Sequence, residues 1–324
     1  YYSGIGVIMA TEKVLALSAS GIIEKEVSTG GGRPVITINT TFYVSTIGSD
    51  VTGDGSVGNP WQSIQFAIDV VCTGYEVSVG VTITIQIADG TYVGTVYHKR
   101  QNGQLTDFTI TLRGNSSNYT AVRIEGNVYG AAFGLQLQYV HCVSSSLSTV
   151  TATQGGIVFL SSSKISCLAA STGFAALSAD LGGTIDIIGN TTVELGTCGA
   201  LARATRGGRI GTGNISRTID IEGTPVVTTA TLVAESGGVI DVGRLTFTGV
   251  AVTGKKFQAT LGGQVVPVDA AIPGSIAGTS DIYYKQNIVG PVSQASGIPT
   301  GAIIESGSNV NGEYIRYADG TLIC

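Results

Sequence analysis

Two aspartates, Asp186 and Asp241, have the type and spacing expected of residues that act on a glycosidic bond. Each lies four residues after the first glycine of a Gly-Gly pair, and Gly211 holds the same offset after a third pair between them. Glycoside hydrolysis uses two carboxyl groups about 5 to 9.5 Å apart, one protonated and one ionised. If the segments stack about 4.8 Å apart, the two aspartates face outward on alternate layers with an open slot between them. Asp220 and Glu222 belong to the intervening segment, so we expect them nearby.

The same acids have a simpler interpretation, because carboxylates on solvated strands are common. We therefore assign no catalytic residue from the sequence, and name Asp186, Asp241 and Glu222 as the candidates if the chain is an enzyme. A lyase would need a base beside a charge-neutralising cluster or calcium-binding carboxylates, and the sequence supports that less.

Three arginines, Arg203, Arg206 and Arg209, lie within one segment. They are candidates for binding an acidic sugar or a phosphate group, with solvation or contact with a neighbouring subunit as the alternative. Tyrosines are the other candidates, because aromatic rings stack on sugar faces and the single tryptophan, Trp61, is better placed to seal the fold. Those considered are Tyr119, Tyr129, Tyr139, Tyr283 and Tyr284, and packing at an edge or a subunit contact is the alternative for each.

The composition disfavours several kinds of partner. A net charge of −5 and the lack of a basic stripe argue against nucleic acid. The two histidines have no ligand-spaced partner, and the five cysteines form no C-x-x-C pair, so we predict no metal site, no cofactor and no disulfide framework. Four of the cysteines, Cys72, Cys142, Cys167 and Cys198, are expected to be small buried apolar residues, as in a reducing compartment.

The first 20 residues contain Glu12 and Lys13 inside an apolar run and have no basic leader. This disfavours a signal peptide and a membrane span. Because the sequence also lacks an initiator Met, we expect it to be part of a longer polypeptide.

The elements that position the candidate residues come from an internal repeat. Five segments carry a Gly-Gly pair, an alanine three residues before it and a Val or Ile three residues after its first glycine. The pairs begin 27, 25, 30 and 25 residues apart, at Gly155, Gly182, Gly207, Gly237 and Gly262.

A repeat of this length, with alternating apolar and polar residues and no helical period, predicts short strands joined by turns. Stacked coils of such strands form a parallel β-helix, with glycine at turns of positive φ and alanine at narrow corners. A β-sandwich with coincidental spacing is the alternative. After "NPW", the apolar residues recur at helical spacing, at Ile64, Ile68 and Val71. This predicts a helix from Pro60 to Val71 that caps the first coil, and we expect Trp61 and Phe66 to help seal that coil.

Two segments resemble a known family type. "FYVSTIGSDVTGDGSVGNPWQSIQFAID" with "TITIQIADGTYVG" resembles the opening of pectate-lyase-like right-handed parallel β-helices, especially those of bacteriophage tailspikes and tail fibres. "IPTGAIIESGSNVNGEYIRYADGTLIC" resembles a segment near the carboxyl ends of phage tail fibres. The resemblance implies an all-β, right-handed solenoid that forms homotrimers and attaches to a bacterial surface.

We therefore expect a connector at 1–40, a capped parallel β-helix at 41–272 and a fibre-like segment at 273–324 that continues beyond Cys324. The expected function is structural: a phage fibre or tailspike that binds a host receptor, in the first place a polysaccharide. A polysaccharide depolymerase is the alternative, and a non-viral secreted β-helix enzyme is disfavoured. The expected partners are two further copies, other tail proteins and the host glycan, in a virion made in the bacterial cytoplasm without membrane insertion.

Overall fold

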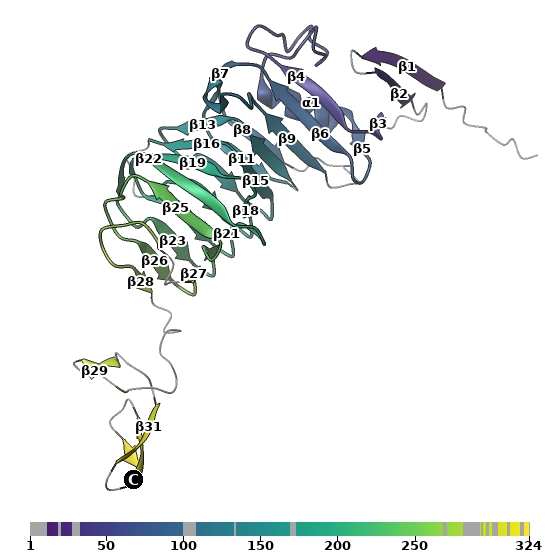
Figure 1. Ribbon diagram of the computed structural model, residues 1–324. Coiled ribbons are helices and arrows are strands. Elements are labelled where there is room, and N and C mark those ends of the chain that lie inside the picture. Colours follow the sequence, from purple (N-terminus) through teal and green to yellow (C-terminus); the bar gives the residue numbers. More distant parts are fainter. Residues whose placement is uncertain are drawn as a thin grey trace, which may run out of the picture. The chain divides into compact units, whose positions relative to one another are not determined.

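The computed structural model shows a mostly-β chain whose main element is a parallel β-solenoid with one short helix in the described residues (Figure 1). The structure describes residues 12–18, 21–27, 33–99, 108–132, 134–168, 173–267, 271–280, 292, 294–295, 298–299, 304–309, 312–317 and 321–323. The chain divides into two compact units, Tyr1–Thr279 and Ser280–Cys324.

Three sheets run along the solenoid. The nine-stranded sheet contains β4 (Thr40–Val44), β6 (Thr82–Ile87), β9 (Thr109–Arg113), β12 (Leu135–Gln138), β15 (Ile157–Ser161), β18 (Thr184–Ile187), β21 (Arg209–Gly211), β24 (Val239–Asp241) and β27 (Gln264–Val266). The seven-stranded sheet contains β7 (Gly90–Val93), β10 (Val122–Glu125), β13 (His141–Ser144), β16 (Lys164–Cys167), β19 (Thr191–Cys198), β22 (Arg217–Val227) and β25 (Leu245–Gly249). The eight-stranded sheet contains β8 (Val96–Lys99), β11 (Val128–Ala131), β14 (Val150–Ala152), β17 (Ala175–Ala179), β20 (Ala200–Thr205), β23 (Leu232–Glu235), β26 (Phe257–Thr260) and β28 (Thr279–Ser280).

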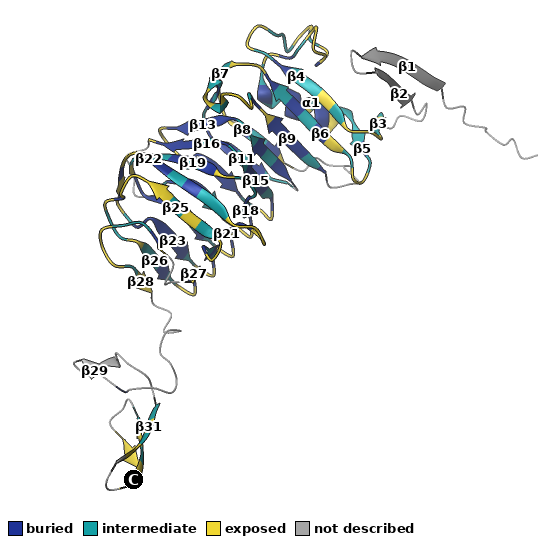
Figure 2. Ribbon diagram, in the orientation of Figure 1, coloured by how far each residue is buried: buried dark blue, intermediate teal, exposed yellow. Residues whose placement is uncertain are grey.

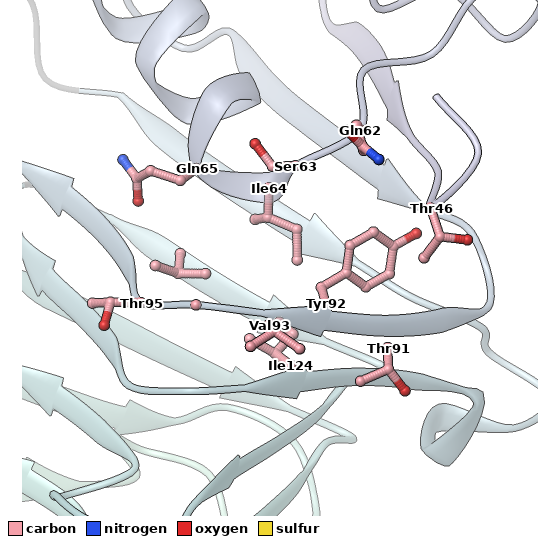
Figure 3. Close-up of a pocket in the computed structure, with 12 residues that line it drawn as sticks. Thr46, Gln62, Ser63, Ile64, Gln65, Thr91, Tyr92, Val93, Thr95 and Ile124 are labelled. Carbon is pink, nitrogen blue, oxygen red and sulfur yellow. The ribbon is translucent and has the colours of Figure 1, made fainter. Parts of the chain in front are cut away.

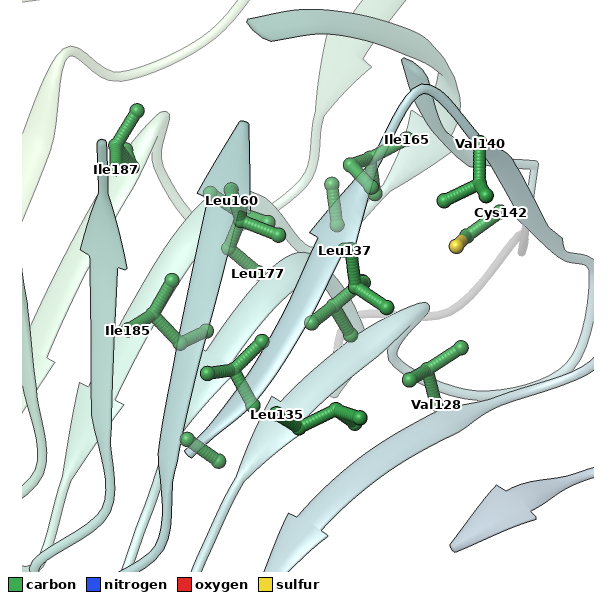
Figure 4. Packing of buried hydrophobic residues seen from close by; sticks show 14 of the residues in the cluster. Val128, Leu135, Leu137, Val140, Cys142, Leu160, Ile165, Leu177, Ile185 and Ile187 are labelled. Carbon is green, nitrogen blue, oxygen red and sulfur yellow. The ribbon is translucent and has the colours of Figure 1, made fainter. Parts of the chain in front are cut away.

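Each complete coil contributes one strand to each of these sheets, whereas β4 at one end and β27 and β28 at the other belong to incomplete coils. The coils stack through parallel pairing, as in the pair of β15 with β18. This confirms the parallel solenoid and excludes the β-sandwich. Buried residues alternate with less buried ones along many of the strands (Figure 2). Alternate side chains therefore point inward, and the buried ones are mostly aliphatic and form one continuous core. Figure 4 shows Leu135, Leu160 and Ile185 from three successive coils pointing into this core.

The repeat identified in the sequence sets the register of the later coils. The five alanines form one ladder through four strand pairs, and all are buried: Ala152, Ala179, Ala204, Ala234 and Ala259. Val158, Ile185, Ile210, Ile240 and Val265 form a second ladder on the nine-stranded sheet. The spacing in the sequence is therefore the length of one coil.

The two glycines of each pair do different things. The first has φ between 74° and 79° in all five turns, as the prediction of a positive φ requires. The second lies against the preceding coil: a Cβ on Gly208 would be 2.2 Å from the carbonyl oxygen of Ala179. Glycine is needed at the first position for backbone conformation and at the second for close approach.

The capping helix α1 spans Ile64–Gly74, so the predicted start at Pro60 is wrong. Asp50 explains the difference, because its carboxylate accepts hydrogen bonds from the backbone N–H groups of Gln62 and Ser63 and from the Ser63 hydroxyl. Ser63 is the N-cap and accepts from the N–H of Phe66. Residues 60–62 lie outside the helix, and Trp61 forms a parallel bridge with Val44.

Trp61 seals the first coil as predicted. Its side chain is buried, its ring stacks on Phe42 with centroids 5.2 Å apart, and Phe66 meets it edge-on. The cysteines also confirm their prediction: Cys72, Cys142, Cys167 and Cys198 are free and buried.

The remaining elements are short. The first unit also contains the antiparallel pair of β1 (Glu12–Ser18) and β2 (Gly21–Val27), the parallel pair of β3 (Val35–Ile36) and β5 (Glu76–Val77), and the 3-10 turn η1 (Tyr119–Ala121). In the second unit β29 (Gln294–Ala295) pairs with β30 (Ile298–Pro299), and β31 (Ile304–Asn309), β32 (Gly312–Tyr317) and β33 (Leu322–Ile323) form an antiparallel sheet.

Candidate functional site

Asp186 and Asp241 lie on the outer face of the nine-stranded sheet, on β18 and β24. Asp186 is paired with Gly211 of β21, and a Cβ on Gly211 would be 3.4 Å from the Cβ of Asp241. Both side chains are half-buried, whereas their neighbours Ile185 and Ile240 point into the core. The two carboxyl groups therefore come from alternate coils with a side-chain-free position between them.

The two carboxyl groups have different surroundings. Burial raises the pKa of Asp186 above its ordinary value, against the opposing effect of Arg209 and Arg217, and its Oδ1 is buried without a hydrogen-bond partner. Asp241 accepts a hydrogen bond of 3.0 Å from the N–H of Gly243, and Nη2 of Arg209 lies 3.8 Å from its Oδ2. Asp186 thus retains its proton to a higher pH than an ordinary aspartate, whereas Asp241 has a hydrogen-bond donor and a cation beside it.

Phe159 extends this surface. It is the register partner of Asp186 on the preceding coil and is half-buried. A line of aromatic ring, carboxyl group, glycine and carboxyl group is an arrangement that can accommodate a sugar chain along the solenoid.

Glu222 is not part of this surface, so its expected place near the two aspartates is wrong. It lies on β22 of the seven-stranded sheet, where its Oε2 is 2.8 Å from Nζ of Lys164. Asp220 is on the same strand and accepts a hydrogen bond from Thr248. The loop between β21 and β22 turns the chain onto the next sheet before these acids are reached.

Glu222 instead joins a polar cluster that the sequence reasoning missed, here called the Lys164 cluster: His141, Lys164, Ser166, Glu194 and Glu222. Lys164 binds Glu194 at 3.2 Å as well as Glu222. The Ser166 hydroxyl donates to Glu194 at 2.7 Å and lies 2.7 Å from Nε2 of His141. Successive strands of the seven-stranded sheet pair Ser166 with Glu194 and Glu194 with Glu222. The spacing of 28 residues in each step, about one coil, was the pattern in the sequence that could have predicted this cluster.

The Lys164 cluster is built for stability more than for reaction. Hydrogen bonding from Ser166 and the cation of Lys164 lower the pKa of Glu194, so this group is held as a carboxylate and is a poor proton donor. In a Ser-His-acid triad the carboxylate contacts the histidine, whereas here the carboxylate of Glu194 contacts Ser166 and not the imidazole of His141. Ser166 is also only 1% exposed, so it cannot act as the nucleophile of such a triad.

The three arginines do not converge on one anion site. Each faces the acid of a neighbouring coil: Arg203 binds Glu235 at 2.8 Å, Arg206 binds Asp180, and Arg209 lies near Asp241. Each positive charge therefore has a carboxylate beside it, which weakens the attraction for an acidic sugar.

The tyrosines give one aromatic surface in the described residues. Tyr129 on β11 meets its register partner Tyr97 edge-on, with ring centroids 5.9 Å apart, and Nζ of Lys99 lies 5.8 Å from the Tyr97 ring. Tyr119 is near Thr192, with 3.4 Å between the hydroxyl oxygens. Tyr283 and Tyr284 lie outside the described residues.

We expect the histidines to make folding pH-dependent. His98 is 2% exposed, its Nδ1 has no hydrogen-bond partner, and burial lowers its pKa to about 4. Below pH 6.5 the unfolded chain takes up this proton and the folded chain does not, so stability is lost as pH falls from about 6.5 towards 4. Burial, Lys164 and Arg123 lower the pKa of His141 to about 4 as well.

Urea unfolding at pH 7 and pH 5 measures this effect. We expect His98 alone to reduce the free energy of unfolding by roughly 1 to 2 kcal/mol at pH 5. A His98→Gln variant, which cannot titrate, should show a correspondingly smaller difference between the two pH values. If His98→Gln loses as much stability between pH 7 and pH 5 as the unaltered chain, His98 is not the group responsible.

No group of three or more His, Cys, Asp or Glu residues in the described part of the chain could hold a metal ion. Among the described residues no helix has both the length and the apolar character needed to cross a membrane.

No family model matches the chain, and no curated protein matches it in sequence. Among solved structures, the crystal structure of Escherichia coli YbhC matches with 12% identity over 73% of this chain and 75% of that chain, at a TM-score of 0.38. A similarity at this level carries no argument about site or activity.

Proposed function

We propose that this chain is part of a bacteriophage tail fibre or tailspike and that its solenoid binds a polysaccharide of the host cell surface. The main support is the outer face of the nine-stranded sheet, where uncharged polar side chains recur in register on successive coils. One such row is Thr41, Thr84, Thr111 and Gln136, in which Thr111 is buried and its hydroxyl donates to the Gln136 amide oxygen. The accessible hydroxyl and amide groups of Thr41, Thr84 and Gln136 follow the stacking of the coils and complement a polymer that repeats its own hydroxyl groups.

Two resemblances support the viral setting: residues 42–69 and 82–94 resemble the opening of β-helices found especially in phage tailspikes and tail fibres, and residues 298–324 resemble a segment of phage tail fibres. Homotrimer formation, other tail proteins as neighbours and a place in the virion belong to the same proposal. Three copies would bind one cell surface at once, and that multivalency strengthens weak individual contacts.

Binding to a panel of capsular and O-antigen polysaccharides tests the proposed receptor. Sedimentation of the purified chain measures its mass in solution and so tests the proposed trimer. We expect at least one polysaccharide to bind, and a Gln136→Ala, Thr84→Ala variant to bind it less tightly. A matched pair of changes on the eight-stranded sheet, Ser178→Ala on β17 and Gln258→Ala on β26, is the control. Failure of every polysaccharide to bind would overturn the proposal.

A polysaccharide depolymerase is a second candidate, favoured by the contrast between Asp186 and Asp241. Asp186, with its raised pKa, would donate a proton to the glycosidic oxygen. Asp241 would remove a proton from a water molecule that attacks the anomeric carbon as the bond to the leaving oxygen breaks. Alternate coils are separated by about 9.6 Å, near the upper end of the range for inverting glycosidases.

Under this candidate, Asp186→Asn and Asp241→Asn should each reduce polysaccharide cleavage about 100-fold or more, because each removes a proton-transfer group. The measurement follows new reducing ends and polymer length. Asp220→Asn, on the seven-stranded sheet, is the control and should cleave normally. Binding without any shortening by the unaltered chain would leave the attachment function alone.

A further inference from the structure

A cavity of about 470 Å³ lies between the start of α1 and the first coil (Figure 3). Its floor is apolar and buried, formed by Ile64, Tyr92, Val96 and Ile124. Its rim carries the exposed polar side chains of Thr46, Gln62, Thr91 and Thr95. The volume is within the range of small-molecule sites, about 300 to 1,000 Å³.

The cavity lies where the end of a sheet is left open. The outer edge of β4 is covered by Gly55 and Trp61, whose backbones bond to Tyr43. The outer edge of β8 is covered by the Gln65 amide, which donates to the carbonyl of Tyr97 at 3.1 Å and accepts from its N–H at 2.6 Å. By contrast, β7 is the terminal strand of its sheet, with no described strand beyond it.

The open edge supplies backbone groups to the cavity. The N–H groups of Gly94 and Val96 donate to the neighbouring coil, at Glu125 and Asn127. Between them, at the corner from β7 to β8, the N–H of Thr95 makes no backbone hydrogen bond within the described residues, so it is available as a donor beside the cavity. This fixed donor adds to the rim hydroxyl and amide groups.

The open stretch is short and closed at one end. At its start, a Cβ on Gly90 would be 2.7 Å from Cγ2 of Thr46, so Thr46 occupies the edge there. What remains is the five residues 91–95, about the length of one ordinary strand with no room to extend past Thr46. A small ligand fits this edge better than an added peptide strand.

The lining also restricts the charge of the ligand, because none of the residues that line the cavity is charged. An ionic group would be desolvated there without a partner, whereas sugar hydroxyls can pair with the rim and the apolar face of a sugar ring can rest on the floor. We propose that this cavity binds a single neutral sugar unit, a hexose or an N-acetylhexosamine. The inference rests on the proposed function in that the sugar would belong to the host polysaccharide.

Saturation-transfer NMR on the whole chain tests this with methyl glycosides of glucose, galactose and mannose, with N-acetylglucosamine, and with glucuronate as the charged probe. We expect at least one neutral probe to bind with a Kd on the order of 1 mM or a few times weaker, and glucuronate not to bind. A Gln62→Leu, Thr95→Val double variant should weaken binding about tenfold or more, since it removes two exposed hydrogen-bonding groups. Thr197→Val, an exposed threonine on β19 away from the cavity, should bind normally.

The outcomes separate this inference from the proposed function. No binding of any neutral probe, equal binding by the double variant, preferred binding of glucuronate, or displacement of the sugar by a strand-forming peptide would overturn the sugar site. Host polysaccharide that binds the double variant as tightly as the unaltered chain would overturn it while leaving the proposed function standing. Neutral sugar binding in the cavity without binding of any bacterial polysaccharide would support the site and overturn the proposed function.

Discussion

Gly208→Ala is expected to lower the free energy of unfolding by about 3 kcal/mol or more. The added Cβ would lie 2.2 Å from the carbonyl oxygen of Ala179 and 2.4 Å from its carbonyl carbon, so two coils would have to move apart. The neighbouring atoms are backbone atoms held in the parallel ladder, and no side chain can rotate to make room. Urea unfolding followed by circular dichroism measures the loss.

Gly207→Ala is the matched control one residue earlier in the same turn. Gly207 has φ of 76°, but a Cβ there would meet nothing within 4 Å. We expect a smaller loss of about 1 to 2 kcal/mol, from backbone strain alone. Equal losses in the two variants would contradict the separate roles assigned to the two glycines.

The repeat allowed the coil length and the stacking of the later coils to be predicted from the sequence. A fixed offset from a Gly-Gly pair carries a side chain to the same row of the same sheet, which is why Asp186, Gly211 and Asp241 are found in one row. The prediction fails where the chain turns onto the next sheet. The loop that follows β21 has no counterpart in the repeat pattern, and Glu222 lies beyond it.

The cavity at the capped end could not be predicted for a related reason. Its lining comes from Thr46, the start of α1, residues 91–96 and Ile124, and of these only Tyr92 and Ile124 are register partners on adjacent coils. The helix start was also misplaced, because Asp50, 13 residues before Ser63, decides where the helix begins through a contact that local helix signals do not contain. The sequence repeat of a solenoid predicts the strand register and the core positions that recur in each coil. The structure at its ends depends on single contacts, such as that of Asp50 with Ser63, which no repeat contains.

Trp61→Ala is expected to lower the free energy of unfolding by about 3 to 5 kcal/mol, the range for truncating a buried aromatic residue. Trp61 is 3% exposed, its Nε1 donates to the carbonyl of Gly53 at 3.1 Å, and its backbone covers the edge of β4. Loss of the ring would leave a cavity under the cap and loosen the segment that covers this edge. Exposed strand edges pair with other chains, so we also expect the variant to aggregate more readily.

Trp61→Phe is the control, because it keeps an apolar ring against Phe42 and loses the hydrogen bond to Gly53. We expect the free energy of unfolding to fall by about 1 to 2 kcal/mol, and the variant to remain monodisperse at the concentration where Trp61→Ala aggregates.

Urea unfolding of the unaltered chain, followed by two signals, tests whether the cap and the solenoid unfold together. Trp61 is the single tryptophan, so its fluorescence reports on the cap and circular dichroism reports on the strands. If the cap stabilises the whole solenoid, the two signals change at the same urea concentration, since one cooperative unit unfolds. A fluorescence transition at clearly lower urea would show that the cap opens by itself, and Trp61→Ala would then cost the solenoid far less than expected here.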